Sequence, residues 1–205
     1  IGVHLLNLLV IPAIVFIYYF KKYETTKWGI IKSAALSIVI LGVIMWGIIP
    51  GVIIVAGWFE LLFVNGFGMP FNTGVVIYAL LLIAGLTFGI RYTLKHNHTV
   101  VNTILTCFVV MLIGYSCYAM VVIRSVSNPP IDENSPDNVF ALLSYISRDQ
   151  YGQEPLVYGP YFNAPVIGVE DAGPIYYQNE KTGKYDIVDH KKEVKYDPRF
   201  CTILP

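Results

Sequence analysis

The chain of 205 residues is 55% hydrophobic and 14% charged, with no net charge at pH 7 and a mean hydropathy of +0.58. These values lie outside the usual range of a soluble globular domain and indicate an integral membrane protein. The net charge is +4 over residues 1–123 and −4 over residues 124–205. Because no basic face is present, the composition argues against a nucleic-acid-binding protein.

Charged residues are distributed unevenly about Arg124. Eight of the 28 precede Arg124 and twenty lie from Arg124 onward. We therefore divide the chain into a transmembrane helical region, residues 1–123, and a water-exposed segment, residues 124–205. The first residue lies inside an apolar run with no charged region ahead of it, so we expect a piece of a longer protein rather than a signal peptide.

Long apolar runs dominate the first 123 residues. A helix needs about 20 apolar residues to cross a hydrocarbon core about 30 Å thick. Spanning helices are therefore predicted at residues 1–20, 28–49, 73–90 and 100–123. Residues 51–71 hold a shorter apolar run interrupted by four glycines and Pro70. They predict a re-entrant or interfacial segment, with a true crossing as the alternative.

Basic residues bear on the orientation of these spans, because short cytoplasmic loops collect Lys and Arg. Residues 21–27 contain three lysines, residues 91–99 contain Arg91 and Lys95, and residues 50–72 contain neither Lys nor Arg. If residues 51–71 do not cross, both basic turns lie in the cytoplasm and residues 124–205 are extracytoplasmic. If they cross, the two turns lie on opposite faces. We predict the first arrangement.

Beyond Arg124 the pattern predicts a small mixed α/β segment. Ser135 is the expected N-cap of a helix because Pro136 follows it at the first helical position. Val139–Ile146 then shows apolar residues at helical spacing, and Gly152 is the expected stop. Strands are predicted at residues 155–158, 175–178 and 184–188, the last two forming a hairpin.

Polar residues inside apolar runs are candidates for chemistry. His4 and Asn7 lie one helical turn apart, where polar side chains must face protein, water or a ligand. An interhelical hydrogen bond is the alternative for this pair. Glu60 is the one acidic residue in an apolar segment. It could act as a base or bind a cation, but we favour a side chain that points to water from an interfacial helix.

The start of the water-exposed segment holds further candidates. Asn128, Asp132 and Glu133 offer amide and carboxylate oxygens, but they lack the spacing and turn glycine of a calcium loop. A rigid Pro-Pro connector is therefore favoured, and no metal site is predicted. Arg148 suits either a phosphate or the C-terminus of its own helix. Aromatic rings with nearby amides suit the binding of a sugar, and these are Tyr158, Tyr161 and Asn163. Aromatic residues also gather at membrane interfaces, which is the alternative explanation.

Three stretches carry a resemblance to a known family: GVHLLNLL at residues 2–9, YYFKKY at residues 18–23, and IRSVSNPPIDENSPDNVFALLSYISRDQYGQEPLVYGPYFNAP at residues 123–165. They resemble a bacterial family of large multispanning proteins related to the protein O-mannosyltransferases, within the C-type glycosyltransferase superfamily (glycosyltransferase family 117). The resemblance implies that the chain is a fragment of a C-type glycosyltransferase-like fold. It also implies an inner-membrane enzyme that moves a sugar from a polyprenyl phosphate to an acceptor on the periplasmic side.

The same resemblance implies roles for particular residues and partners. In similar enzymes the catalytic base is an acidic residue of an early outer loop, which we expect ahead of Ile1. His4 and Asn7 resemble a His-x-x-Asn feature of such enzymes. Substrate and donor binding is expected at His4, Asn7, Asn128, Asp132, Glu133, Arg148, Tyr158, Tyr161 and Asn163. The expected partners are the bilayer, the lipid-linked sugar, an exported protein with acceptor Ser or Thr, and the rest of the polypeptide. A transporter or flippase subunit and a non-catalytic membrane scaffold are the alternatives.

Overall fold

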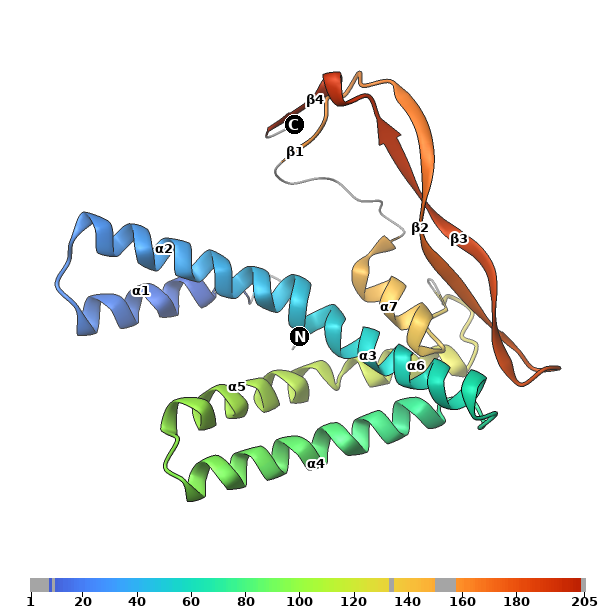
Figure 1. Ribbon diagram of the computed structural model, residues 1–205, viewed down its shortest axis with the longest axis horizontal. Helices are drawn as coiled ribbons and strands as arrows, with labels where there is room; N and C mark the ends of the chain where they lie inside the picture. Colours follow the sequence, from blue (N-terminus) through green and yellow to red (C-terminus); the bar gives the residue numbers. More distant parts are fainter. Residues whose placement is uncertain (1–7, 9, 133–134, 150–157, 204–205) are drawn as a thin grey trace.

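The structure is a computed structural model that describes residues 8, 10–132, 135–149 and 158–203. Long helices run side by side, and a two-stranded ribbon rises from one end of them (Figure 1). The helical segments are α1 Val10–Lys22, α2 Lys27–Gly42, η2 Val43–Ile48, α3 Ile49–Leu61, η3 Leu62–Gly66, α4 Thr73–Lys95, α5 Thr99–Tyr115, α6 Tyr118–Val126, α7 Val139–Ser147 and η5 Pro198–Phe200. The strands are β1 Tyr158–Pro160, β2 Val166–Asn179, β3 Lys184–Tyr196 and β4 Cys201–Ile203.

Among the described residues, three helices are long and apolar enough to cross a membrane: Lys27–Gly66, Thr73–Lys95 and Thr99–Val126. The runs predicted at residues 28–49, 73–90 and 100–123 each lie within one of these helices. The prediction that much of residues 1–123 forms helices compatible with membrane spans is therefore confirmed. For the run predicted at residues 1–20, α1 covers the second half, and residues 1–7 and 9 lie outside the described residues.

The helix Lys27–Gly66 contains most of residues 51–71, whose relation to the membrane stays a prediction. Residues 51–66 continue the preceding helix without a break, and the whole Lys27–Gly66 helix has 40 residues. Pro50 follows a π-helical stretch, η2, in which the Ile49 N–H donates to the Ile44 carbonyl five residues back. This wider turn accommodates a proline, which has no N–H and crowds the carbonyl four residues earlier. At about 1.5 Å per residue the helix is about 60 Å long, twice the thickness of a hydrocarbon core.

The two basic turns lie at one end of the helices. Figure 1 shows the α1–α2 turn and the α4–α5 turn on the left, whereas η3, α7 and the tip of the ribbon lie on the right. The α1–α2 turn is fixed by Tyr19, whose hydroxyl donates to the Glu24 carbonyl at 2.8 Å and accepts from the Thr26 N–H at 3.1 Å. The two basic turns therefore lie on the same side of the helical region, and the side of the membrane that they occupy stays a prediction.

The helices α3 and α4 cross with almost no space between their backbones. A Cβ at Gly74 would lie 2.4 Å from both the Glu60 Cα and the Phe59 carbonyl oxygen. Only glycine permits this approach, because backbone atoms cannot move aside as a flexible side chain can. The crossing therefore fixes the first turn of α4 against the last turns of α3.

The cap and the stop of α7 differ from the prediction. Asn138, not Ser135, is the N-cap, and its side-chain oxygen accepts from the N–H groups of Phe140 at 3.0 Å and Ala141 at 2.9 Å. Ser135 has a φ of 36°, outside the extended region that an N-cap adopts. The helix ends before Gly152, because Arg148 takes the left-handed conformation, φ 58°, and its N–H donates to the Ser144 and Tyr145 carbonyls.

The predicted hairpin is confirmed, with longer strands than expected. β2 and β3 pair antiparallel and end with Asn179 opposite Lys184. In the turn, the Gly183 N–H donates to the Asn179 carbonyl at 2.8 Å and Gly183 has a φ of 66°. Three register irregularities keep the two long strands paired while adding twist. β1 pairs with β4, and of the strand predicted at residues 155–158 only Tyr158 lies within the described residues.

Candidate functional site

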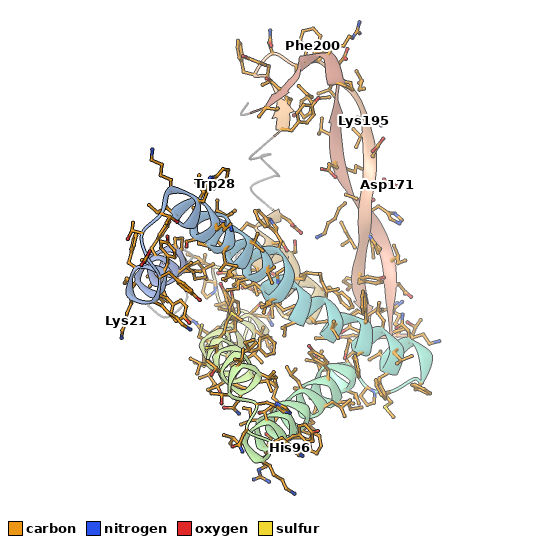
Figure 2. The ribbon with its side chains drawn as sticks, turned by 60° about the vertical axis from the view of Figure 1, so that its left-hand side comes forward. Lys21, Trp28, His96, Asp171, Lys195 and Phe200 are labelled. Carbon is orange, nitrogen blue, oxygen red and sulfur yellow. The ribbon has the colours of Figure 1, made fainter. Side chains whose placement is uncertain are left out.

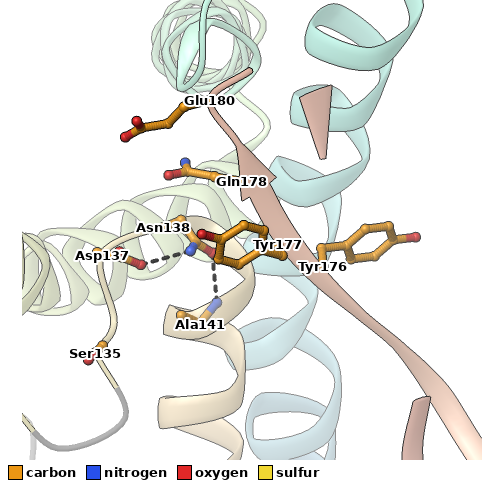
Figure 3. Close-up of a pocket in the computed structure, with 8 residues that line it drawn as sticks. All are labelled: Ser135, Asp137, Asn138, Ala141, Tyr176, Tyr177, Gln178 and Glu180. Atoms are coloured by element: carbon orange, nitrogen blue, oxygen red, sulfur yellow. Dashed lines mark hydrogen bonds between the residues drawn. The ribbon is translucent and has the colours of Figure 1, made fainter. Parts of the chain in front are cut away.

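A pocket of about 280 Å³ lies between the start of α7 and the end of β2 (Figure 3). Its walls come from two segments that are far apart in the sequence. They are lined by Ser135, Asp137, Asn138, Ala141, Tyr176, Tyr177, Gln178 and Glu180. The lining residues include two carboxylates, Asp137 and Glu180, and two amides, Asn138 and Gln178, and none of them is Lys or Arg.

The helix side of the pocket is held by Asn138. Its side-chain oxygen caps α7, and its Nδ2 donates to the Asp137 carboxylate at 2.7 Å. Figure 3 shows both bonds as dashed lines. One amide therefore ends the helix and also orients a carboxylate at the wall of the pocket.

The strand side is held by aromatic packing. The Tyr176 ring lies 4.5 Å from the Phe140 ring, centroid to centroid. In Figure 3 the Tyr177 ring extends toward Asp137 and Asn138, whereas the Tyr176 ring points away from them. Tyr177 is 63% exposed, so its ring is available to a ligand. Tyr176 therefore anchors the strand to α7, and Tyr177 forms part of the wall.

Behind the pocket a hydrogen-bond chain leads to the long helix. The Gln178 Nε2 donates to the Tyr185 hydroxyl at 2.9 Å, and this hydroxyl donates to the Glu60 carboxylate at 3.1 Å. Burial raises the pKa of Tyr185, an effect that the bond from Gln178 partly offsets. The phenol is therefore protonated at neutral pH, as a donor to a carboxylate must be.

Glu60 lies in α3, and its side chain is fully buried against the start of α4. Its carboxylate accepts from the backbone N–H groups of Asn72 and Val75, the second at 3.1 Å. Asn72 precedes α4 with a φ of 69° and forms no side-chain cap. Glu60 supplies the missing acceptor from a neighbouring helix, where a negative charge is also favoured by the helix dipole. The expectation that Glu60 points to water is therefore wrong.

Tyr185 joins the ribbon to the helical region at its backbone as well. The Asn65 amide donates to the Tyr185 carbonyl and accepts from the Tyr185 N–H, both at 2.8 Å. The rings of Phe71 and Phe140 meet the Tyr185 ring edge-on, at centroid distances of 5.1 Å and 5.0 Å. A second link joins Lys191 of the ribbon to Asp149, just after α7. The ribbon is thus fastened to the membrane-compatible helices by specific polar contacts.

The predicted site residues fall in separate places. The Ser125 hydroxyl of α6 donates to Asp132 at 2.6 Å, and the Asn128 N–H donates to the Ser125 carbonyl at 2.9 Å. These contacts fold the connector back onto the end of α6. Arg148 forms the C-cap of α7. His4, Asn7 and Glu133 lie outside the described residues.

The remaining predicted residues lie around the β1–β4 pair. Tyr158 is in β1, the Tyr161 N–H donates to the Phe200 carbonyl at 2.8 Å, and Asn163 follows in the same loop. Figure 1 places β1 and β4 at the opposite end of the ribbon from its turn, so these residues and the pocket do not form one cluster. The structure thus brings Asn128 and Asp132 together at Ser125, while Arg148 caps α7 and the aromatic group lies at the β1–β4 pair.

Sequence reasoning missed the residues that line the pocket and the role of Glu60. A lone carboxylate in an apolar helix needs buried partners, and this need was the available signal for Glu60. Asp137 and Asn138 stand at a recognisable helix start. Tyr177 of β2 and Glu180 of the ribbon turn showed no signal, because only the fold brings them to α7.

Comparison with known proteins gives one partial match. Residues 152–205 match a family described as "Family of unknown function (DUF8416)". The match covers the ribbon and the β1–β4 pair, about a quarter of the chain. No curated protein and no solved structure matches the chain.

Proposed function

We propose that this chain is part of a membrane glycosyltransferase that moves a sugar from a polyprenyl-phosphate donor to an acceptor, protein Ser or Thr, on the extracytoplasmic face. The resemblance of residues 2–9, 18–23 and 123–165 to the C-type glycosyltransferases supports the reaction class. The location that follows is the bacterial inner membrane, with residues 124–205 in the periplasm.

The observation that carries the proposal is the position of the polar pocket. An enzyme with a lipid-linked donor must bring a substrate embedded in the bilayer to an acceptor in water. Such a site belongs where membrane helices meet a water-exposed segment. The pocket lies between α7 and β2, and Gln178, Tyr185 and Glu60 connect it to the helix Lys27–Gly66.

Within this proposal, Arg148 and Asp132 serve the donor. A guanidinium offsets the charge that develops on the phosphate as the sugar leaves. Asp132 is held by Ser125 at the end of α6, which gives its carboxylate a fixed place beside the end of a membrane-compatible helix.

Sugar transfer tests the proposal directly. Full-length protein in membrane vesicles is given a radiolabelled polyprenyl-phosphate sugar and a Ser/Thr acceptor peptide. Arg148→Ala and Asp132→Asn are each expected to lower transfer at least about tenfold, because each removes a charged group that acts on the transition state. The matched controls are Arg199→Ala, in η5, and Asp171→Asn, in β2 and labelled in Figure 2. Both should keep normal transfer.

The two ways in which this proposal can fail are distinct. If the unaltered protein transfers no sugar from any polyprenyl-phosphate donor, the enzyme assignment is wrong and a transporter or scaffold takes its place. If transfer occurs and both Arg148→Ala and Asp132→Asn leave it unchanged, the donor-binding assignment is wrong while the activity stands.

Sidedness has its own test in cysteine-free full-length protein that carries single new cysteines. Glu24→Cys and Lys95→Cys lie in the two basic turns, and Lys181→Cys lies in the turn of the ribbon. In intact spheroplasts an impermeant maleimide should label only the cysteine at position 181, and the other two should react after permeabilisation. Opposite behaviour of positions 24 and 95 would contradict the proposed arrangement.

A further inference from the structure

The size of the pocket limits its ligand to one small group. Ligand sites for drug-sized molecules occupy about 300–1,000 Å³, and this pocket, at about 280 Å³, lies just below that range. A single ring or one side chain fits this space better than an oligomer or a lipid tail. The polar lining also disfavours an apolar group, because it would leave the carboxylates and amides unpaired.

The charge of the lining excludes a phosphate. Asp137 and Glu180 contribute two carboxylates, and the lining contains no Lys or Arg. A phosphate group would meet like charge without a compensating cation. The pocket therefore does not hold the phosphate end of a lipid-linked donor.

The lining contains both hydrogen-bond donors and acceptors, and this favours a ligand with hydroxyl groups over a cation. A cation offers only donors and is best met by acceptors alone. This lining also carries hydroxyl and amide donors, including Ser135, Tyr177 and Gln178. Sugar hydroxyls both donate and accept, so they can satisfy both kinds of group.

The wall residues are also held in place before a ligand arrives. Asp137 accepts from Asn138 and Gln178 donates to Tyr185, so neither side chain needs to be ordered on binding. Tyr177 presents a largely exposed ring, and an aromatic face packs well against the apolar face of a sugar ring. Among the described residues Glu180 makes no hydrogen bond or ion pair, which leaves its carboxylate for a ligand.

We propose that this pocket binds one neutral sugar ring, through stacking on Tyr177 and hydroxyl hydrogen bonds to Asp137, Gln178 and Glu180. The inference deepens the proposed function, on which its biological role rests: the pocket holds a sugar carried by the acceptor or the product, apart from the donor phosphate.

Direct binding to the full-length protein in nanodiscs, without a lipid donor, tests the inference. The probes for saturation-transfer NMR are methyl α-mannopyranoside and methyl β-glucopyranoside, with inorganic phosphate and Nα-acetyl-lysine amide as competitors. At least one glycoside should bind, with neither competitor displacing it. Tyr177→Ala and Glu180→Gln should each weaken its binding about fivefold or more. Phe162→Ala and Glu193→Gln, exposed residues of the same segment outside the pocket, should leave it unchanged.

Several results would overturn the inference. These are no binding of either glycoside, displacement by phosphate or by the lysine derivative, and equal binding by both pocket variants and the unaltered protein. Glu180→Gln changes an exposed side chain, so it remains informative if Tyr177→Ala does not fold. Glycoside binding without any sugar transfer would overturn the proposed function and leave the pocket assignment intact. Transfer without glycoside binding would do the reverse.

Discussion

Replacing Gly74 by alanine is expected to force α3 and α4 apart and to destabilise the protein by about 3 kcal/mol or more. The new Cβ would lie 2.4 Å from two backbone atoms of α3. Overpacking of a core commonly costs about 1–3 kcal/mol when side chains can adjust. Here the obstructing atoms belong to a helix backbone, so we expect the upper end of this range. The midpoint of thermal unfolding should therefore fall by several degrees.

Gly85→Ala is the matched control, because a Cβ at Gly85 would meet no atom within 4 Å and both glycines lie in α4. Alanine is a better helix former than glycine by about 1 kcal/mol, so this variant should unfold at the same temperature or slightly higher. Both midpoints are measured on the full-length protein in the same detergent. Equal midpoints for the two variants would show that the close crossing does not exist.

Removing the Glu60 carboxylate is expected to have the second large effect. Glu60→Ala leaves the Asn72 N–H, the Val75 N–H and the Tyr185 hydroxyl without their acceptor. Each unsatisfied buried donor costs about 1–3 kcal/mol, so we expect a loss of about 3 kcal/mol or more. Glu60→Gln should lie between this variant and the unaltered protein, because the amide keeps one acceptor oxygen and turns its NH₂ toward donors.

The expected order of the unfolding midpoints is unaltered protein, Glu60→Gln, then Glu60→Ala. Glu24→Gln, in the exposed α1–α2 turn, is the control for loss of one acidic charge and should not change the midpoint. Limited proteolysis provides a second measurement, because the ribbon should be cut sooner in both Glu60 variants than in the control. A Glu60→Ala protein as stable as the control would mean that Glu60 faces water after all.

Local patterns predicted much of the helical region. Apolar runs about as long as a bilayer crossing located three membrane-compatible helices, whose first residues lie within one position of the prediction. The end of the first helix, at Gly66, was predicted at residue 49. The continuity of the helix through Pro50 and Gly51 was not predictable, because proline and glycine normally interrupt a helix. The π-helical turn Val43–Ile48 depends on backbone geometry that composition does not reveal.

The structure of residues 124–205 was less predictable from local sequence patterns. Asn179 and Gly183 mark the ribbon turn, so the hairpin was predictable, but its full strands were not, because Val166–Asn179 lacks a regular alternation of buried and exposed residues. At the start of α7, Ser135 and Asn138 are both good caps, and the sequence alone did not show that Asn138 would be used. Glu60 meets Tyr185 across 125 positions, and no local pattern encodes a pairing of that range.

The continuous helix from Lys27 to Gly66 also has a mechanical consequence. Its first turn follows the basic α1–α2 turn. Its last turns carry Glu60 and Asn65, which form hydrogen bonds with Tyr185 of the ribbon. A rod about 60 Å long converts a tilt of about 5° at one end into a displacement of about 5 Å at the other. A small tilt of this helix at the basic turns would therefore move the ribbon by several ångströms. The π-helical turn at Val43–Ile48 is the place where the helix bends most easily.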